Sequence, residues 1–152
     1  MALKLIISAF AEGAAIPKLH TCDGADLSPA LEWSGEPAGA QGFALIVDDP
    51  DAPVGTWNHW LLYDIPADVH SLAQGFKPGQ AGLSGANDFG KRGYGGPCPP
   101  RGHGPHRYFF KLFALDAASL KLPEGARRAE LDRALRGHVL EEAQYMGRYE
   151  RR

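Results

Sequence analysis

Residues 107–115 of the 152-residue chain read RYFFKLFAL. Aromatic and aliphatic side chains dominate this run, which is typical of a β-strand. Two other runs have the same character: FALIV at 43–47, and WNHWLLYDI at 57–65, where Pro66 follows and ends the segment. We expect these three segments to be the principal strands of the fold.

Shorter segments flank them. Residues 3–7 and 31–33 are interpreted as short strands, and residues 143–149 alternate in a way that favours a last strand. One helix is predicted over 128–140, because Leu131, Leu135 and Val139 recur at a spacing of four and would line one face. Gly137 weakens this prediction near its end.

The chain is rich in residues that interrupt regular structure, with 19 glycines and 12 prolines. Such frequent breakers leave little room for long helices. The longest loop-rich stretch, 71–105, is expected to be ordered and functional. Short strands separated by turns predict a mainly β fold, an antiparallel β-sandwich with a few short peripheral helices, in a single domain over residues 1–152.

Composition excludes several classes of protein. Hydrophobic residues make up 44% and charged residues 22%, which argues against disorder and coiled coil. The net charge is −2, and no basic patch is evident, so no nucleic-acid partner is expected. The N-terminal apolar run is too short for a membrane span and lacks the features of a signal peptide, which favours a cytoplasmic protein.

The two cysteines, Cys22 and Cys98, fit a reducing compartment in which disulfides are not needed. They could still pair if the fold brings them together. The sequence leaves both arrangements open.

Two separated segments carry candidate chemistry. The first is DDPDAP at 48–53 followed by WNHW at 57–60, where prolines stiffen a turn between carboxylates and a histidine. An aspartate that accepts a hydrogen bond from one histidine nitrogen leaves the other nitrogen for a ligand. Prolines and aspartates also form ordinary turns, however, and a histidine between two tryptophans can be a core residue.

The second segment, residues 94–108, reads YGGPCPPRGHGPHRY. Its glycines let the backbone approach a ligand, whereas its prolines stiffen the chain and remove amide donors. It is not a phosphate-binding P-loop, because no Gly-Lys-Ser/Thr follows. His106 and Tyr108 are two positions apart on the predicted strand, so they should face the same side. Together they would suit an anion.

Other residues receive plainer interpretations. Trp33 and Trp60 are expected in the core, and Phe89 and Tyr94 are candidates for the mouth of the pocket. The remaining histidines outside the predicted helix, which we expect at the surface, are His20, His70 and His103.

These motifs together resemble the phosphatidylethanolamine-binding protein family, also called Raf-kinase-inhibitor-like proteins, and in particular its short bacterial and archaeal branch. The resemblance rests on DPDAP at 49–53, HW at 59–60, GPCPP at 96–100 and HRYFFKLFALD at 106–116. It covers almost the whole chain. It implies an antiparallel β-sandwich with a small pocket that binds phosphate groups, phosphoethanolamine headgroups or small carboxylates.

The resemblance also implies which residues bind the ligand. They are Asp49, Asp51, Trp57, His59, Gly96, Cys98, Pro99, Pro100, His106 and Tyr108, with Asp51 supporting the others from behind. It further implies no cofactor, a regulatory or inhibitor-like role, a protein partner such as a kinase or a protease, and a homodimer. The short stretch 53–59, and the absence of a closing helix after Tyr149, predict a more open pocket than in long members of the family.

Three alternatives compete with anion binding without catalysis. A metal-dependent hydrolase would use His59, His106 and Asp49 as zinc ligands, although their spacing matches no recognised metal motif. A protein-interaction module would inhibit a kinase or a protease. Thiol chemistry at Cys98 would need a nearby positive charge to activate the sulfur.

Overall fold

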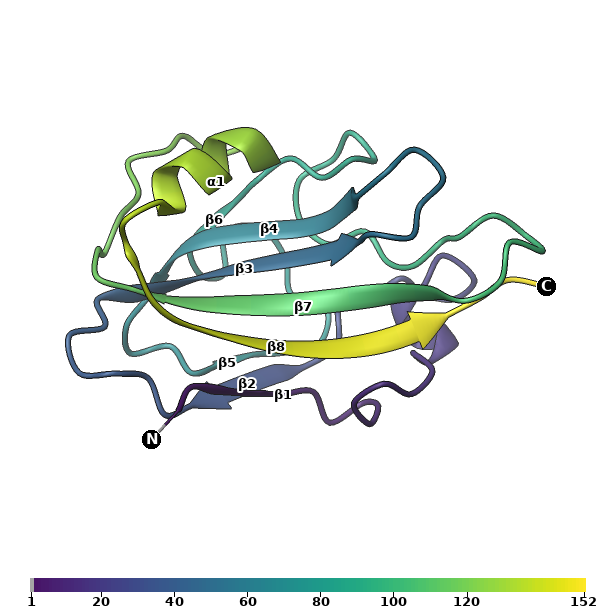
Figure 1. The fold of residues 1–152 in the computed structure, drawn as a ribbon, viewed down its shortest axis with the longest axis horizontal. Coiled ribbons are helices and arrows are strands. Elements are labelled where there is room, and N and C mark those ends of the chain that lie inside the picture. The colour runs from purple at the N-terminus through teal and green to yellow at the C-terminus, as the bar shows by residue number, and fades with distance from the viewer. Residues whose placement is uncertain (1) are drawn as a thin grey trace.

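The computed structural model describes residues 2–152 and shows two antiparallel β-sheets packed face to face (Figure 1). The smaller sheet has the order β1-β2-β5, formed by β1 (Lys4–Ile6), β2 (Leu31–Ser34) and β5 (Ser71–Leu72). The larger has the order β6-β4-β3-β7-β8, formed by β6 (Leu83–Ser84), β4 (Trp57–Pro66), β3 (Gly42–Asp49), β7 (His106–Leu115) and β8 (Val139–Tyr149). The predicted β-sandwich is therefore confirmed.

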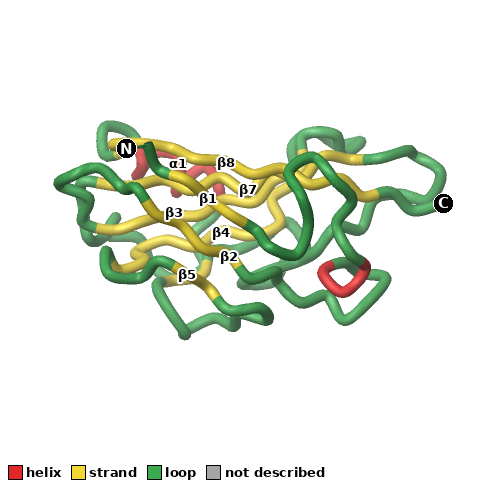
Figure 2. Tube along the Cα trace, turned by 90° about the horizontal axis from the view of Figure 1, so that it is seen from below, coloured by secondary structure: helices red, strands yellow, loops and turns green. Residues whose placement is uncertain are grey.

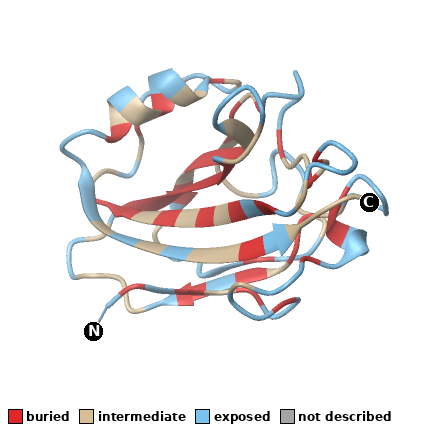
Figure 3. Cartoon of the chain, turned by 45° about the vertical axis from the view of Figure 1, so that its right-hand side comes forward, coloured by how far each residue is buried: buried red, intermediate tan, exposed pale blue. Residues whose placement is uncertain are grey.

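The central strand β3 is buried along its whole length, because the larger sheet is covered on both faces at this strand (Figure 3). Phe43, Leu45 and Val47 point into the core between the two sheets. Ala44 and Ile46 point the other way, into a second core. The α-helix α1 (Arg128–Leu135) covers that second core with Leu131 and Leu135. Such double burial explains why the sequence of β3 is continuously apolar rather than alternating.

The predicted helix extended too far. The observed helix ends at Leu135, and Gly137 adopts a left-handed backbone conformation with φ of 81°, which terminates a helix. Val139, expected on the helix face, instead begins β8, which is four residues longer at its start than predicted. Strands β5 and β6, and a short 3-10 helix at Lys18–His20, are elements that the sequence did not predict.

A disulfide bond joins Cys22 to Cys98 across a sequence separation of 76 residues. It fastens the segment after the 3-10 helix to the glycine- and proline-rich segment before β7, where the Cys22 amide also donates to the Pro97 carbonyl. Of the two arrangements that the sequence left open, the structure therefore shows the paired one. A cytoplasmic location stays a prediction, and it loses the support that unpaired cysteines gave it.

The helices described for residues 2–152 include none long and apolar enough to cross a lipid bilayer.

Removing the disulfide should destabilise the protein without changing its fold. Closing a loop of this length restricts the unfolded chain, which is worth about 2–4 kcal/mol in typical proteins. We expect the double variant Cys22→Ser/Cys98→Ser to lose that much free energy of unfolding in a urea titration. The control is the unaltered protein measured with and without a reductant. Equal stability of the oxidised and reduced proteins would contradict a structural role for the bond.

Candidate anion-binding site

The candidate site lies at one end of the sandwich, where β3 ends and β4 and β7 begin. Figure 2 shows how loops gather beyond the ends of the strands. The loop between β3 and β4, and the long segment that leads into β7, bring together the two parts of the sequence that were predicted to act together. Both parts contribute side chains to one cavity of about 220 Å³.

A β-bulge places His59 in this cavity. Val47 pairs with Trp60 and Asp48 pairs with Asn58, so His59 is the extra residue on its strand. Bulges of this kind redirect side chains, and they are frequent beside functional sites. His59 is 3% exposed, and its ring packs edge-on against the rings of Phe89 and Tyr108.

The hydrogen bond of His59 determines its chemistry. Its Nδ1 lies 2.7 Å from the Gly95 carbonyl oxygen, so Nδ1 carries the proton and donates. Burial lowers the pKa of His59 below its ordinary value of 6.5, although the Gly95 carbonyl and the charge of Asp49 act in the opposite direction. The imidazole is therefore neutral at pH 7, and its Nε2 carries a lone pair.

Asp49 and His106 form the second part of the site. His106 Nδ1 lies 2.7 Å from Asp49 Oδ2, and both side chains are almost completely buried. The other oxygen of Asp49 accepts the backbone amide of Asp51 at 2.8 Å. A buried carboxylate needs such partners, because an unpaired charge in the interior is very costly.

Tyr108 lies beside this pair. His106 and Tyr108 are two residues apart on β7, and both are buried and line the same cavity, as predicted from their spacing. Their rings lie nearly parallel. The hydroxyl of Tyr108 has no hydrogen-bond partner among residues 2–152, although the side chain is only 1% exposed. Burial, with the charge of Asp49 adding to it, raises the pKa of Tyr108 well above its ordinary value, so the hydroxyl keeps its proton.

Most residues predicted to bind the ligand do line this cavity. They are Asp49, Trp57, His59, Cys98, Pro99, Pro100, His106 and Tyr108. Asp51 and Gly96 lie outside it.

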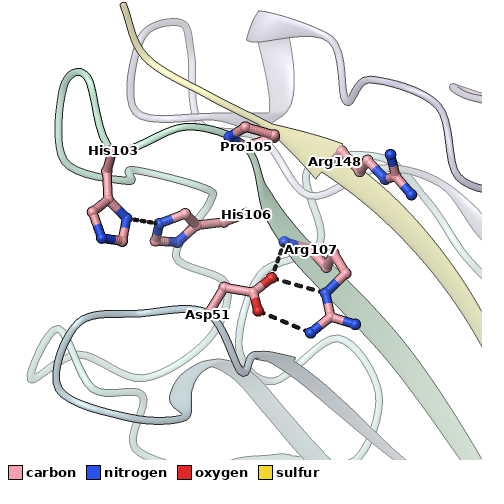
Figure 4. Close-up of a pocket in the computed structure, with 6 residues that line it drawn as sticks. All are labelled: Asp51, His103, Pro105, His106, Arg107 and Arg148. Carbon is pink, nitrogen blue, oxygen red and sulfur yellow. Dashed lines mark hydrogen bonds and ion pairs between the residues drawn. The ribbon is translucent and has the colours of Figure 1, made fainter.

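Asp51 faces away and binds Arg107 (Figure 4). Its carboxylate accepts two bonds from the Arg107 guanidinium, at 2.9 and 2.8 Å, and one from the Arg107 backbone amide at 2.9 Å. These bonds lower the pKa of Asp51 to about 2. Asp51 thus ties the loop after β3 to the start of β7 and does not line this cavity.

Gly96 is required for packing. A side chain there would come within 2.3 Å of the His20 carbonyl oxygen, and the Gly96 amide already donates to Asp26. The amide is therefore not available to an anion. The reason for glycine at this position is the close approach of the 18–26 segment, which the sequence did not indicate.

The third carboxylate of the motif, Asp48, points to the opposite face of the sheet. It accepts hydrogen bonds from Arg128 of α1 at 2.9 Å and from Lys111 at 3.1 Å. Arg128 also donates to Asn58, the neighbour of His59 on β4. Asp48 thus anchors the helix and takes no part in the cavity.

Two alternatives from the sequence lose their geometric basis. Cys98 lines the cavity but is bonded to Cys22, so it is not the free thiol that thiol chemistry would need. The metal-dependent hydrolase needs a cluster of ligands, and residues 2–152 contain no group of three His, Cys, Asp or Glu side chains arranged to hold a metal ion. One nitrogen of His59 and both nitrogens of His106 already have partners within the protein.

Sequence reasoning also missed several residues. Ala52, Pro53 and Val54 line the cavity from the loop after β3, and their only signal was their place in the DPDAP turn. Of the two candidates for the mouth of the pocket, Phe89 lines the cavity. Tyr94 does not line it, and its hydroxyl donates to the His20 carbonyl instead.

Two of the histidines expected at the surface have other roles. His20 is 2% exposed and hydrogen-bonds to the Leu27 carbonyl, so its expected position at the surface is wrong. His103 is exposed, but its ring contacts His106, which no sequence pattern indicated.

Comparison with known proteins identifies the family. The model of the phosphatidylethanolamine-binding protein family matches residues 6–150. The chain therefore belongs to this family.

Relatives of similar length support the assignment. A UPF0098 protein of Aquifex aeolicus is 49% identical over 98% of this chain and 89% of its own length. A UPF0098 protein of Pyrococcus horikoshii is 44% identical over 100% and 78%.

Two solved structures are also similar. A homologue of phosphatidylethanolamine-binding protein from Chlamydia trachomatis has a TM-score of 0.91 and 38% identity, over 99% of each chain. YbcL of E. coli, described as a new member of the mammalian PEBP family, has a TM-score of 0.92 and 33% identity over the full length of each.

Replacing Asp51 should separate its structural role from ligand binding. The Asp51→Asn variant should lose about 1 kcal/mol of stability or less, because the ion pair with Arg107 is partly exposed to solvent. Above about pH 4 the wild-type carboxylate is charged, and its contribution is lost as the pH falls towards about 2.

The affinity of this variant for a small anion should stay within about twofold of the wild type, as measured by calorimetry. A loss of about tenfold or more would mean that Asp51 belongs to the binding site.

Proposed function

We propose that this protein binds a small anion, either a phosphate group such as that of phosphoethanolamine or a carboxylate, in the cavity between β3, β4 and β7. The observation that carries the proposal is the buried hydroxyl of Tyr108, which has no hydrogen-bond partner among residues 2–152 and lies in a cavity that also exposes Nε2 of His59. A buried polar group without a partner is costly, and an anionic oxygen would satisfy it.

The other walls of the cavity are mainly apolar. Trp57, Phe89 and the prolines at 99 and 100 surround the polar end, and Val54 at the rim is 79% exposed. Few polar groups in an apolar cavity are typical of sites that orient one small ligand. The cavity of about 220 Å³ suits a ligand of the size of phosphoethanolamine or a short carboxylate.

Binding should be coupled to the uptake of a proton. The Nε2 atom of the neutral His59 is an acceptor, because its proton is on Nδ1. It can donate to an anion only as the imidazolium. An anion beside it favours the charged ring and so raises its pKa.

The first test is a titration followed by NMR of the histidine side chains. Adding phosphate or phosphoethanolamine should shift the imidazole signals of His59 and His106 in a saturable way, and acetate should shift those of His59. His70, an exposed histidine paired with Glu36 away from the cavity, is the internal control and should not move. Unmoved signals from His59 and His106 at saturating anion would refute the proposal.

The second test is the pH dependence of affinity, with acetate as the probe because it stays ionised throughout the range. Acetate binding should strengthen as the pH falls from about 8 to about 6, by at most about tenfold per pH unit, since one proton is taken up at His59. The His59→Gln variant should lose this dependence, and His70→Gln should retain it. A wild-type affinity that does not change with pH would contradict the proton uptake.

We also propose that the protein acts by binding rather than by catalysis. The side chains around the cavity include no serine, threonine or free cysteine that could act as a nucleophile. A regulatory or inhibitor-like role, with a kinase or a protease as partner, and a homodimeric state rest on family resemblance. A pull-down that captures a protein partner with the wild type but not with the His59→Ala variant would support the regulatory role. The molecular mass in solution decides whether the protein is a homodimer.

A further inference from the structure

The imidazole of His103 occupies the hydrogen-bonding position of His106 that a ligand would use (Figure 4). His103 Nδ1 lies 2.6 Å from His106 Nε2, and Asp49 accepts from the other nitrogen of His106. Since Nδ1 of a neutral His106 carries the proton for Asp49, its Nε2 has a lone pair, and the His103 Nδ1–H donates to it. Both nitrogens of the buried His106 are therefore used within the protein.

His106 lies in the wall between two neighbouring cavities. It lines the cavity that contains His59 and Tyr108, and also an adjacent one of about 380 Å³ that contacts His103, Arg107 and other residues. An anion in the first cavity can reach His59 and Tyr108 directly. It can reach Nε2 of His106 only after the ring of His103 has moved.

The loop that carries His103 is suited to such a movement. His103 is exposed, and the residues on either side are Gly102 and Gly104, with φ of 75° and 89°. Glycine reaches both signs of φ at little steric cost, so the backbone can rotate on each side of the imidazole. His106 is the hydrogen-bond partner of that imidazole, so displacement breaks a single side-chain bond.

We propose that His103 is a specificity-determining residue of this site, an internal competitor that a ligand must displace to bind His106. This inference rests on the proposed anion-binding function. The two oxygens of a carboxylate are satisfied by His59 and Tyr108. A phosphate that keeps one proton also carries a P–OH group, and this group can donate to the lone pair on Nε2 of His106 only after His103 has been displaced. The competitor therefore weakens phosphate binding more than carboxylate binding.

The test compares inorganic phosphate and acetate by calorimetry at one pH. The His103→Ala variant should bind phosphate about threefold to tenfold more tightly than the wild type, the equivalent of one hydrogen bond no longer broken. Its affinity for acetate should stay within about twofold. His103→Asn should behave like the wild type, because its side-chain amide can occupy the position of Nδ1. His138→Ala is the matched control, because His138 is an exposed histidine paired with Asp116 outside either cavity.

A second readout follows the ring nitrogens of His106 by NMR. In the His103→Ala variant, phosphate should shift Nε2 of His106 at a lower concentration than in the wild type. If the wild type binds phosphate and His103→Ala binds it equally or more weakly, the competitor proposal fails and the pocket proposal stands. An equal gain for phosphate and acetate would overturn the selectivity. If neither anion binds any of the proteins, both proposals fail.

Discussion

The central strand of the larger sheet, β3, is covered on both faces, and this constraint determines where polar chemistry can occur. Along the middle of β3 every side chain enters one of two apolar cores, so a polar group there would have no partner. The strand ends are the places where carboxylates and histidines can be paired. Asp48 and Asp49, successive residues at the end of β3, point to opposite faces and find different cations and donors. Asp48 anchors the helix, and Asp49 supports the cavity.

The same constraint explains how much could be predicted from the sequence. For most ends of the three central strands, the predicted and observed boundaries differ by no more than one residue. Buried strands are rich in apolar residues, and a proline or a glycine often marks where they stop. The pairing of β3 with β4 and β7, and hence the meeting of Asp49, His59 and His106, follows from that assignment once the family resemblance is added. Most of the candidate site was therefore predictable.

What could not be predicted depends on contacts between distant residues. The apolar spacing that suggested a helix up to Leu140 is shared by a strand that begins at Val139, and only the backbone of Gly137 separates them. The two-residue strands β5 and β6 are too short to carry a pattern. The role of Gly96 depends on its contact with His20, and the role of His103 on its contact with His106. No local sequence pattern predicts either contact.

The disulfide has a consequence for how the chain responds to proteolysis. The bond between Cys22 and Cys98 encloses β2 to β6 and the exposed turns at residues 77–80. Exposed loop tips with small and polar residues are the preferred places for proteases to cut. A single cut anywhere between the two cysteines yields two fragments that remain covalently joined, so both histidine-bearing walls of the cavity stay on one molecule. A cut within this ring therefore separates His59 from His106 only after the disulfide is also reduced, whereas one cut in the exposed turn at residues 101–103, outside the ring, separates them directly.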